Sequence, residues 1–155
     1  MTIREAHTFD IPEIQVVRHS VKENILSDPS LVTDQLCAEY LTVRGKGWVC
    51  EVEGIIAGFA IVDLKENNVW ALFLRPTYEG FGIGKKLHDT MLNWYFSQKQ
   101  ETIWLSTEFN TRAEKFYRRQ GWQQTGIHGS DEIRFEMSYE TWLSKKTQSI
   151  NLISD

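Results

Sequence analysis

The segment that decides the fold is residues 72–87, Leu72-Phe73-Leu74-Arg75-Pro76-Thr77-Tyr78-Glu79-Gly80-Phe81-Gly82-Ile83-Gly84-Lys85-Lys86-Leu87. An apolar run ends before Pro76, and glycines then alternate until a helical pattern begins. Proline lacks a backbone N–H and favours extended geometry in the residue before it, so Pro76 ends a strand. Glycine lets the backbone come close to a ligand, and a helix start carries partial positive charge. The segment therefore predicts a strand, a turn and a helix whose N-terminus suits phosphate oxygens.

The glycine spacing argues against two other phosphate-binding turns. A dinucleotide turn needs Gly-x-Gly-x-x-Gly directly after the strand, but Lys85 occupies the position of the third glycine. A P-loop needs Ser or Thr after its Gly-Lys pair, but Lys86 follows here, and Glu79 stands where its first glycine should be. A turn that binds no ligand and a cradle for another pyrophosphate both stay open at this point.

The sequence upstream of the turn predicts an antiparallel sheet. Three runs are rich in β-branched and aromatic residues, namely Trp48–Glu53, Ile55–Leu64 and Val69–Leu74. Glu53-Gly54 and Glu66-Asn67-Asn68 separate them in the manner of hairpin turns. These runs therefore predict a meander of three strands.

Two helices and a short strand are expected before this meander. Thr2–Ala6 is the strand candidate, and Asp10 is expected to cap a helix with an apolar stripe that includes Ile14 and Val17. Thr33 or Asp34 is expected to cap a second helix that runs to about Val43.

Two more helices and three more strands are expected after the turn. A helix over Gly82–Ser97 precedes a strand over Thr102–Ser106, and Asn110 or Thr111 caps a helix that ends before Gly121. The last strands are Trp122–Ile127 and Glu132–Tyr139, with a short helix through Leu143 after them. The order β-α-α-β-β-β-α-β-α-β-β predicts an α/β (α+β) fold, with a mixed, mostly antiparallel sheet of about seven strands flanked by four helices.

Composition narrows the functional classes. The chain has 155 residues, which fits one domain, and its 41% hydrophobic and 25% charged residues are typical of globular proteins. Its formal net charge of −4 argues against nonspecific nucleic-acid binding, which needs a basic surface. The two cysteines, Cys37 and Cys50, form no CxxC motif and are interpreted as reduced, buried thiols. No apolar run is long enough to cross a membrane.

Two motifs together resemble the GNAT superfamily of acetyltransferases. Residues 75–84 resemble its central motif, Q/R-x-x-G-x-G/A after a strand and Pro, and residues 110–122 resemble its second motif. The resemblance covers about residues 48–139 strongly. It implies a GNAT-like fold, acetyl-CoA as cosubstrate without a metal, and transfer of an acetyl group to a primary amine by direct attack in a ternary complex. The acetyltransferase domain is expected to span residues 1–144, and the polar residues 145–155 are expected to form a C-terminal tail.

The resemblance also implies roles for particular residues. The backbone of Leu72, Phe73 and Leu74 would bind the pantetheine arm and the acetyl carbonyl, as a ligand strand adds to a sheet edge. Tyr117 would act as general acid toward the departing thiolate, and Asn110 would bind pantetheine or cap a helix. The pyrophosphate would lie on the loop residues Gly80, Phe81, Gly82, Ile83, Gly84 and Lys85.

Some positions depart from the family pattern or leave a role open. Glu79 stands where the family usually has Gln or Arg, and Phe81 where it often has Arg. A glutamate that many relatives carry on the fifth strand has no equivalent in Ile103-Trp104-Leu105-Ser106. The candidates for the general base are Glu51, Glu108, His128 and Glu132, and a chain of water molecules is a further alternative.

The expected partners are an amine on a small molecule or a peptide, with no nucleic acid and no membrane, and a homodimer stays open. The expected location is the cytoplasm. Two other functions stay open, namely a catalytically silent acyl-CoA-binding GNAT domain that acts as a sensor, and an interaction module in which the glycines are purely structural.

Overall fold

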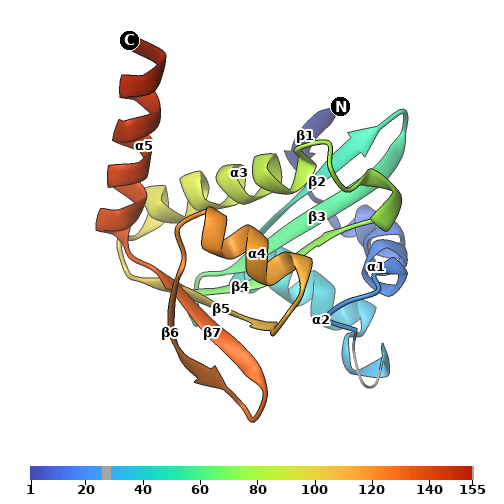
Figure 1. The fold of residues 1–155 in the computed structure, drawn as a ribbon. Coiled ribbons are helices and arrows are strands. Elements are labelled where there is room, and N and C mark those ends of the chain that lie inside the picture. The colour runs from blue at the N-terminus through green and yellow to red at the C-terminus, as the bar shows by residue number, and fades with distance from the viewer. Residues whose placement is uncertain (26–28, 155) are drawn as a thin grey trace. The chain divides into compact units, whose positions relative to one another are not determined.

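The computed structural model describes residues 1–25 and 29–154. Residues 26–28 and 155, the last residue of the expected tail, lie outside the described residues. The chain divides into two compact units, residues 1–95 and 96–155, which are described one at a time. The order of elements in Figure 1 confirms the predicted succession of strands and helices, and the short helix expected at its end is a long α-helix.

The first unit contains a four-stranded antiparallel sheet in the order β1-β2-β3-β4. Its strands are β1 (Thr2–Glu5), β2 (Gly45–Val52), β3 (Ile55–Asp63) and β4 (Asn68–Leu74). Glu53 and Gly54, both with positive φ, form the predicted β2–β3 turn. The sequence thus predicted this meander correctly, because its strands are local in sequence and are marked by turn residues.

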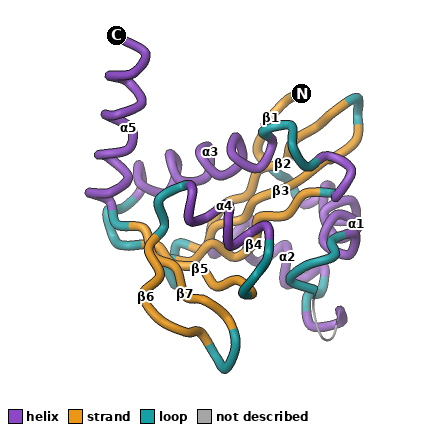
Figure 2. Tube along the Cα trace, viewed as in Figure 1, coloured by secondary structure: helices purple, strands orange, loops and turns teal. Residues whose placement is uncertain are grey.

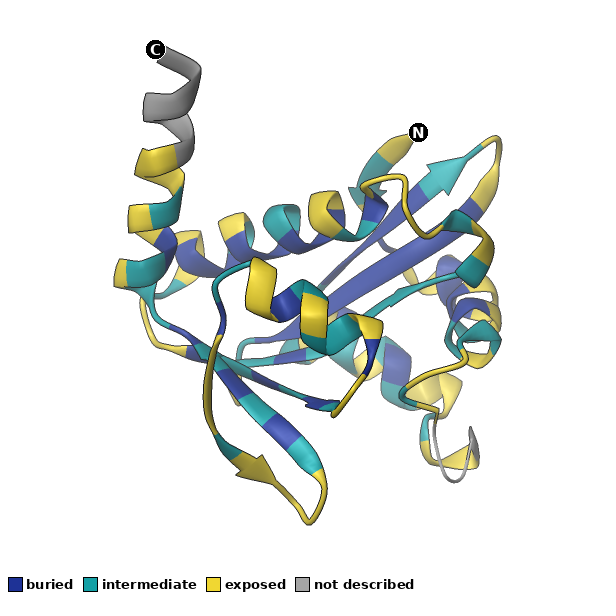
Figure 3. Ribbon diagram, viewed as in Figure 1, coloured by how far each residue is buried: buried dark blue, intermediate teal, exposed yellow. Residues whose placement is uncertain are grey.

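Helices cover both faces of this sheet. On one face, α1 (Ile11–Ser20) and α2 (Asp34–Glu39) pack Ile14, Val17 and Cys37 against Phe59 and Ile61 of β3. On the other face, Gly58 of β3 lies against Leu87 of α3 (Ile83–Gln98). Figure 3 shows β3 as buried along most of its length. Each buried aliphatic or aromatic side chain stabilises the unit by about 1.5–3 kcal/mol.

The connections around α1 and α2 differ from the simple capped helices that the sequence predicts. Asp10 precedes α1, but its carboxylate does not cap that helix. Instead it accepts hydrogen bonds from the Arg4 guanidinium at 2.8 and 2.9 Å and from the His7 backbone N–H at 2.8 Å. Thr33, not Asp34, caps α2, and the chain continues as a π-helix over Tyr40–Arg44. The helix predicted to run to about Val43 is therefore present as an α-helix that continues into a π-helix.

The second unit is a three-stranded antiparallel sheet with two helices. Its strands β5 (Ile103–Glu108), β7 (Glu132–Met137) and β6 (Gln123–His128) lie in that order, so β7 is central. Helix α4 (Arg112–Arg119) connects β5 to β6. The last helix, α5 (Tyr139–Ser154), is much longer than the predicted short helix through Leu143. The described residues therefore contain five α-helices instead of the four expected.

Helix α5 extends through most of the segment that is expected to form a polar tail from residue 145. No Gly or Pro interrupts residues 139–154, so nothing in that stretch stops a helix once it has begun. The side chains that follow residue 145 are largely polar, which is the only sequence feature that favours a tail. Polarity alone does not distinguish an exposed helix from a tail.

Candidate active site

The end of β4 is held firmly against β3. Leu72, Phe73 and Leu74 pair with Ala60, Phe59 and Gly58, and β4 is the outermost strand of the first unit's sheet. Beyond it, the backbone N–H of Arg75 donates to the carbonyl of Ala57 at 2.8 Å, and its side-chain Nε donates to the carbonyl of Ile56 at 2.8 Å. The turn that follows therefore starts from a fixed position.

The turn between β4 and α3 presents backbone rather than side chains. Pro76–Tyr78 forms a short 3-10 turn, and loop follows it up to the start of α3 (Figure 2). Gly80 and Gly82 have φ of +87° and +80°, which strongly favour glycine. Apart from their chain neighbours, no atom of residues 1–25 and 29–154 lies within 4 Å of where their Cβ atoms would be. The open space on this side is what a cradle for phosphate oxygens requires.

Helix α3 begins where this glycine loop ends. The Lys86 N–H donates to the Gly82 carbonyl at 3.2 Å, which closes the first helical turn. The backbone N–H groups of Ile83, Gly84 and Lys85 come before this first helical hydrogen bond. No carbonyl within the helix can accept from them, because the first N–H groups of a helix have no intrahelical partner. Ile83 is buried and anchors the start, whereas Phe81 is 70% exposed. Backbone donors, a helix dipole and open space thus fit a pyrophosphate.

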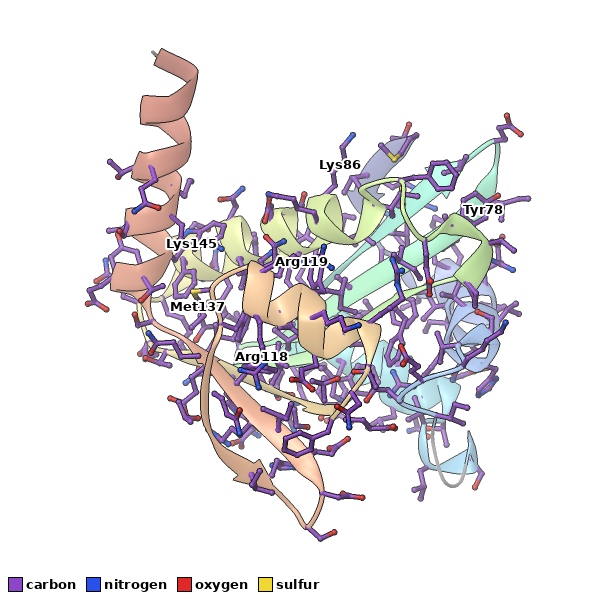
Figure 4. The ribbon with its side chains drawn as sticks, viewed as in Figure 1. Tyr78, Lys86, Arg118, Arg119, Met137 and Lys145 are labelled. Atoms are coloured by element: carbon purple, nitrogen blue, oxygen red, sulfur yellow. The ribbon has the colours of Figure 1, made fainter. Side chains whose placement is uncertain are left out.

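The charged side chains near the loop are those of Lys85, Lys86 and Glu79. The Lys85 ammonium pairs with the Asp89 carboxylate at 2.6 Å, and His88 Nδ1 lies 2.9 Å from the same carboxylate. Burial raises the pKa of Asp89, but the hydrogen bonds from His88 and Lys85 outweigh it and bring the pKa below its usual value. Lys86 projects from the first turn of α3 in Figure 4. Glu79, the departure from the family pattern, is exposed.

In the second unit, Tyr117 is enclosed by aromatic rings. Its side chain is 6% exposed, and the rings of Trp122 and Phe135 lie 5.7 and 6.2 Å from its own. The predicted glycine at the helix end, Gly121, has φ of +92°, and the Trp122 N–H donates to the Tyr117 carbonyl at 3.1 Å. This helix ending brings Trp122 back onto Tyr117. Burial raises the pKa of Tyr117 above its usual value, so the phenol is protonated at neutral pH.

Thr111, not Asn110, caps α4. The Thr111 hydroxyl accepts from the Glu114 N–H at 3.1 Å, and the Glu114 carboxylate accepts from the Asn110 N–H at 2.8 Å. Thr111 thus caps the helix through its hydroxyl, and Asn110, the residue before the cap, supplies only its backbone N–H. Asn110 is exposed and has φ of +61°. Its side chain is therefore not used by the helix start.

Three of the four candidate bases lie in one row. Glu132 of β7 is paired with Glu108 of β5 on one side and with His128 of β6 on the other. Directly paired residues point to the same face of a sheet, so the three side chains are neighbours. Glu51 is in the first unit, where it accepts a hydrogen bond from Arg4 Nε at 2.7 Å. The strand register places these three residues side by side, and the sequence alone does not predict that register.

One residue of interest was missed from the sequence. Arg18 in α1 lies four positions after Ile14, so it continues the buried stripe of that helix. A cation on an apolar stripe was the available signal. Its guanidinium carbon lies 4.8 Å from the centre of the Phe73 ring and 5.4 Å from that of Trp70, both in β4.

The predicted residues thus form two groups, Leu72–Leu74 with Gly80–Lys85 in the first unit, and Asn110 with Tyr117 in the second. A comparison with family models matches residues 13–122 to the acetyltransferase (GNAT) family. The chain belongs to the GNAT acetyltransferase family. The prediction of an acetyltransferase is confirmed at this level, and a search of curated proteins found no match.

Solved GNAT structures share the fold at low sequence identity. The ribosomal-protein-S18-alanine N-acetyltransferase of Escherichia coli is 17% identical with a TM-score of 0.73, covering 89% of this chain and 93% of its own. A Thermoplasma acidophilum PaiA N-acetyltransferase in complex with coenzyme A is 16% identical with a TM-score of 0.74, covering 89% and 98%. A GNAT acetyltransferase of Staphylococcus aureus Mu50 is 22% identical with a TM-score of 0.76, also covering 89% and 98%. These likenesses confirm the predicted GNAT fold.

Two searches of the described residues concern metals and membranes. No cluster of three or more His, Cys, Asp or Glu side chains that could hold a metal ion occurs in residues 1–25 and 29–154. Over the same part of this GNAT chain, every helix is too short or too polar to cross a bilayer.

Proposed function

We propose that this GNAT protein transfers an acetyl group from acetyl-CoA to a primary amine by direct attack in a ternary complex. The observation that carries the proposal is the turn at Gly80–Lys85, where two positive-φ glycines and a helix start present bare backbone. A ligand with a pyrophosphate and an amide-rich arm matches it. The phosphates would lie on the turn, and the arm would extend along the backbone of Leu72–Leu74. Asn110 would supply a side-chain amide to the same arm.

The cysteines support direct attack over an acetyl-enzyme. The chain has two, Cys37 and Cys50, and both are free and buried, as predicted. Burial raises the pKa of both thiols, so neither is a thiolate at neutral pH. An amine nitrogen is then the nucleophile: it forms a bond to the thioester carbonyl carbon, and the carbon–sulfur bond breaks.

Tyr117 accounts for the proton that the departing sulfur takes up. Its raised pKa keeps the phenol in the acid form, so it can donate to the thiolate. The amine must lose protons in exchange, and the row of Glu108, Glu132 and His128 offers acceptors for them. The acceptor would be a small molecule or a peptide, and the free thiols favour a reducing compartment such as the cytoplasm.

Two measurements in sequence test the proposal. Acetyl-CoA should raise Tm more than ATP does at equal concentration, because only acetyl-CoA carries both the pyrophosphate and the arm. A panel of primary amines should then release CoA thiol with equal amounts of acetylated amine. Stabilisation without turnover across the panel would instead favour the silent acyl-CoA-binding domain, and no stabilisation would refute the proposed cradle.

A further inference from the structure

The Arg18 guanidinium lies against two aromatic rings of β4 and has no counter-charge among the described residues. Its guanidinium lies over Phe73 and Trp70, and the Tyr40 ring stacks on Trp70 at 4.0 Å and 9°. Two of its nitrogens, Nε and Nη1, are enclosed and have no hydrogen-bond partner within residues 1–25 and 29–154. Arginine stays charged in proteins, so this is an enclosed cation.

Two other partly buried arginines of this unit, Arg44 and Arg4, are neutralised within the chain. Arg44 lies over the Tyr40 ring of the same cluster, but it donates to the buried Asp63 carboxylate at 2.6 and 3.2 Å. Arg4 is paired with both Asp10 and Glu51. Enclosing a charge without a counter-charge is unfavourable. Arg18 therefore stands out as a cation whose counter-ion is missing from the described part of the chain.

A second side chain with an unpartnered polar atom lies one helical turn away. Gln15 donates through Nε2 to the Val32 carbonyl at 2.8 Å and to Asp34 at 3.2 Å, but its enclosed Oε1 has no partner among the described residues. Residues three apart on a helix share a face. One face of α1 thus offers an unused donor group and an unused acceptor atom, which together suit a polar ligand rather than an apolar one.

Arg18 lies on the face of the sheet away from the glycine turn. Phe73 contacts Phe59 at 5.8 Å, and Phe59 belongs to the core beneath α1 and α2. The glycine turn opens α3, which covers the opposite face, where Gly58 meets Leu87. The phosphates of acetyl-CoA would therefore lie on one face and Arg18 on the other, although both adjoin β4.

We propose that Arg18 binds a carboxylate of the acceptor, so that the natural acceptor is an amine that also carries a carboxylate. This inference rests on the proposed acetyl transfer, for which it names the substrate class. A guanidinium held against two rings is pre-oriented, and carboxylate is the partner whose planar geometry it matches. The bond orients the amine relative to the thioester that β4 would hold.

The experiment compares matched amines. Glycine, β-alanine and glycylglycine are each tested beside the corresponding C-terminal amide, and release of CoA thiol gives kcat/KM. The wild-type chain should favour the carboxylate member by about 10- to 100-fold, as for a hydrogen bond to a charged group. Arg18→Met should abolish the preference, mainly through KM. Comparing the two chains on the same pair cancels the intrinsic reactivity of each amine.

Three controls complete the design. Arg18→Lys retains the charge and should retain part of the preference. Arg44→Gln removes a neighbouring cation that is already paired, and it keeps an amide donor for Asp63, so the preference should remain. The affinity of Arg18→Met for acetyl-CoA, measured by calorimetry, should equal that of the wild type.

The outcomes separate this inference from the proposed function. Equal preference in the wild type and Arg18→Met, or weakened acetyl-CoA binding in Arg18→Met, would overturn it. Acetylation of the amides alone, or of no member of any pair while acetyl-CoA still binds, would overturn it as well. Absence of acetyl-CoA binding by the wild type would refute the proposed function itself.

Discussion

Replacing Gly82 by alanine tests whether the turn before α3 binds phosphates through its backbone. The φ of Gly82 is +80°, and alanine at such an angle costs about 1–2 kcal/mol of stability. Gly54, in the β2–β3 turn, has φ of +78°. As at Gly82, no described residue other than its chain neighbours lies within 4 Å of where a Cβ atom would be. Gly54→Ala therefore imposes a similar backbone strain at a position with no expected ligand.

The two variants should lose similar stability but differ in affinity. A Tm decrease of about 2–8 °C is expected for each, given about 2–4 °C per kcal/mol for a chain of this size. In Gly82→Ala, the new methyl group enters the space left for phosphate, or the loop rotates to avoid it. Either change removes at least one charge-assisted hydrogen bond, so Kd for acetyl-CoA should rise about tenfold or more. Gly54→Ala should leave Kd unchanged.

Lys85→Ala completes the series and is measured by calorimetry at the same ionic strength. Lys85 is exposed and already paired with Asp89, so its loss should raise Kd about fivefold or less. Equal Kd values for Gly54→Ala and Gly82→Ala would refute the reasoning, and so would a larger effect of Lys85→Ala than of Gly82→Ala.

Three further predictions concern buried groups. Tyr117→Phe should lower kcat by roughly 10- to 100-fold with unchanged affinity for acetyl-CoA, and a wild-type kcat would show that another donor protonates the sulfur. Burial raises the pKa of Tyr117, so above pH 10 the phenol keeps its proton in the folded chain and loses it on unfolding. The free energy of unfolding of the wild type should therefore fall with pH in this range, by up to about 1.4 kcal/mol per pH unit more than that of Tyr117→Phe. Denaturant titrations of both chains measure the difference. The Arg4 hydrogen bonds hold the pKa of Asp10 below 3.8, so this carboxylate stabilises the fold above that pH and the effect is lost as pH falls further. Asp10→Asn should cost about 2–4 kcal/mol in urea titrations at pH 7, and parallel acid transitions of the wild type and this variant would contradict the pairing.

The parts of the fold that the sequence predicts are those with local signals. Pro76 and the alternating glycines mark the turn before α3, and Glu53-Gly54 marks the β2–β3 hairpin. The sequence offers two residues as the cap of α4, although Thr111 and Glu114 have the spacing of a capping box. The positive φ of Asn110, which a cap residue does not adopt, depends on how β5 leads into α4.

The parts that the sequence does not predict depend on contacts between distant residues. The row of Glu108, Glu132 and His128 follows from strand register across three strands. Arg18 and Arg44 lie over different rings of one aromatic cluster. Of the two, Arg44 is paired with a buried carboxylate, that of Asp63, and no local sequence pattern reveals this difference. The sequence could thus predict which residue types can act in the site. Which charged side chains have a partner of opposite charge, and which do not, required the structure.

The most direct test of the central claim is a single-turnover reaction in which the protein, acetyl-CoA and the amine with the highest kcat/KM are mixed and quenched over time. Mass spectrometry follows the acetylated amine and the protein, and a thiol reagent follows free CoA. Direct attack predicts that acetylated amine and free thiol appear together in equal amounts, with no acetyl group on the protein at any time. Thiol release that precedes the acetylated amine, with transient acetylation of the protein, would contradict the account.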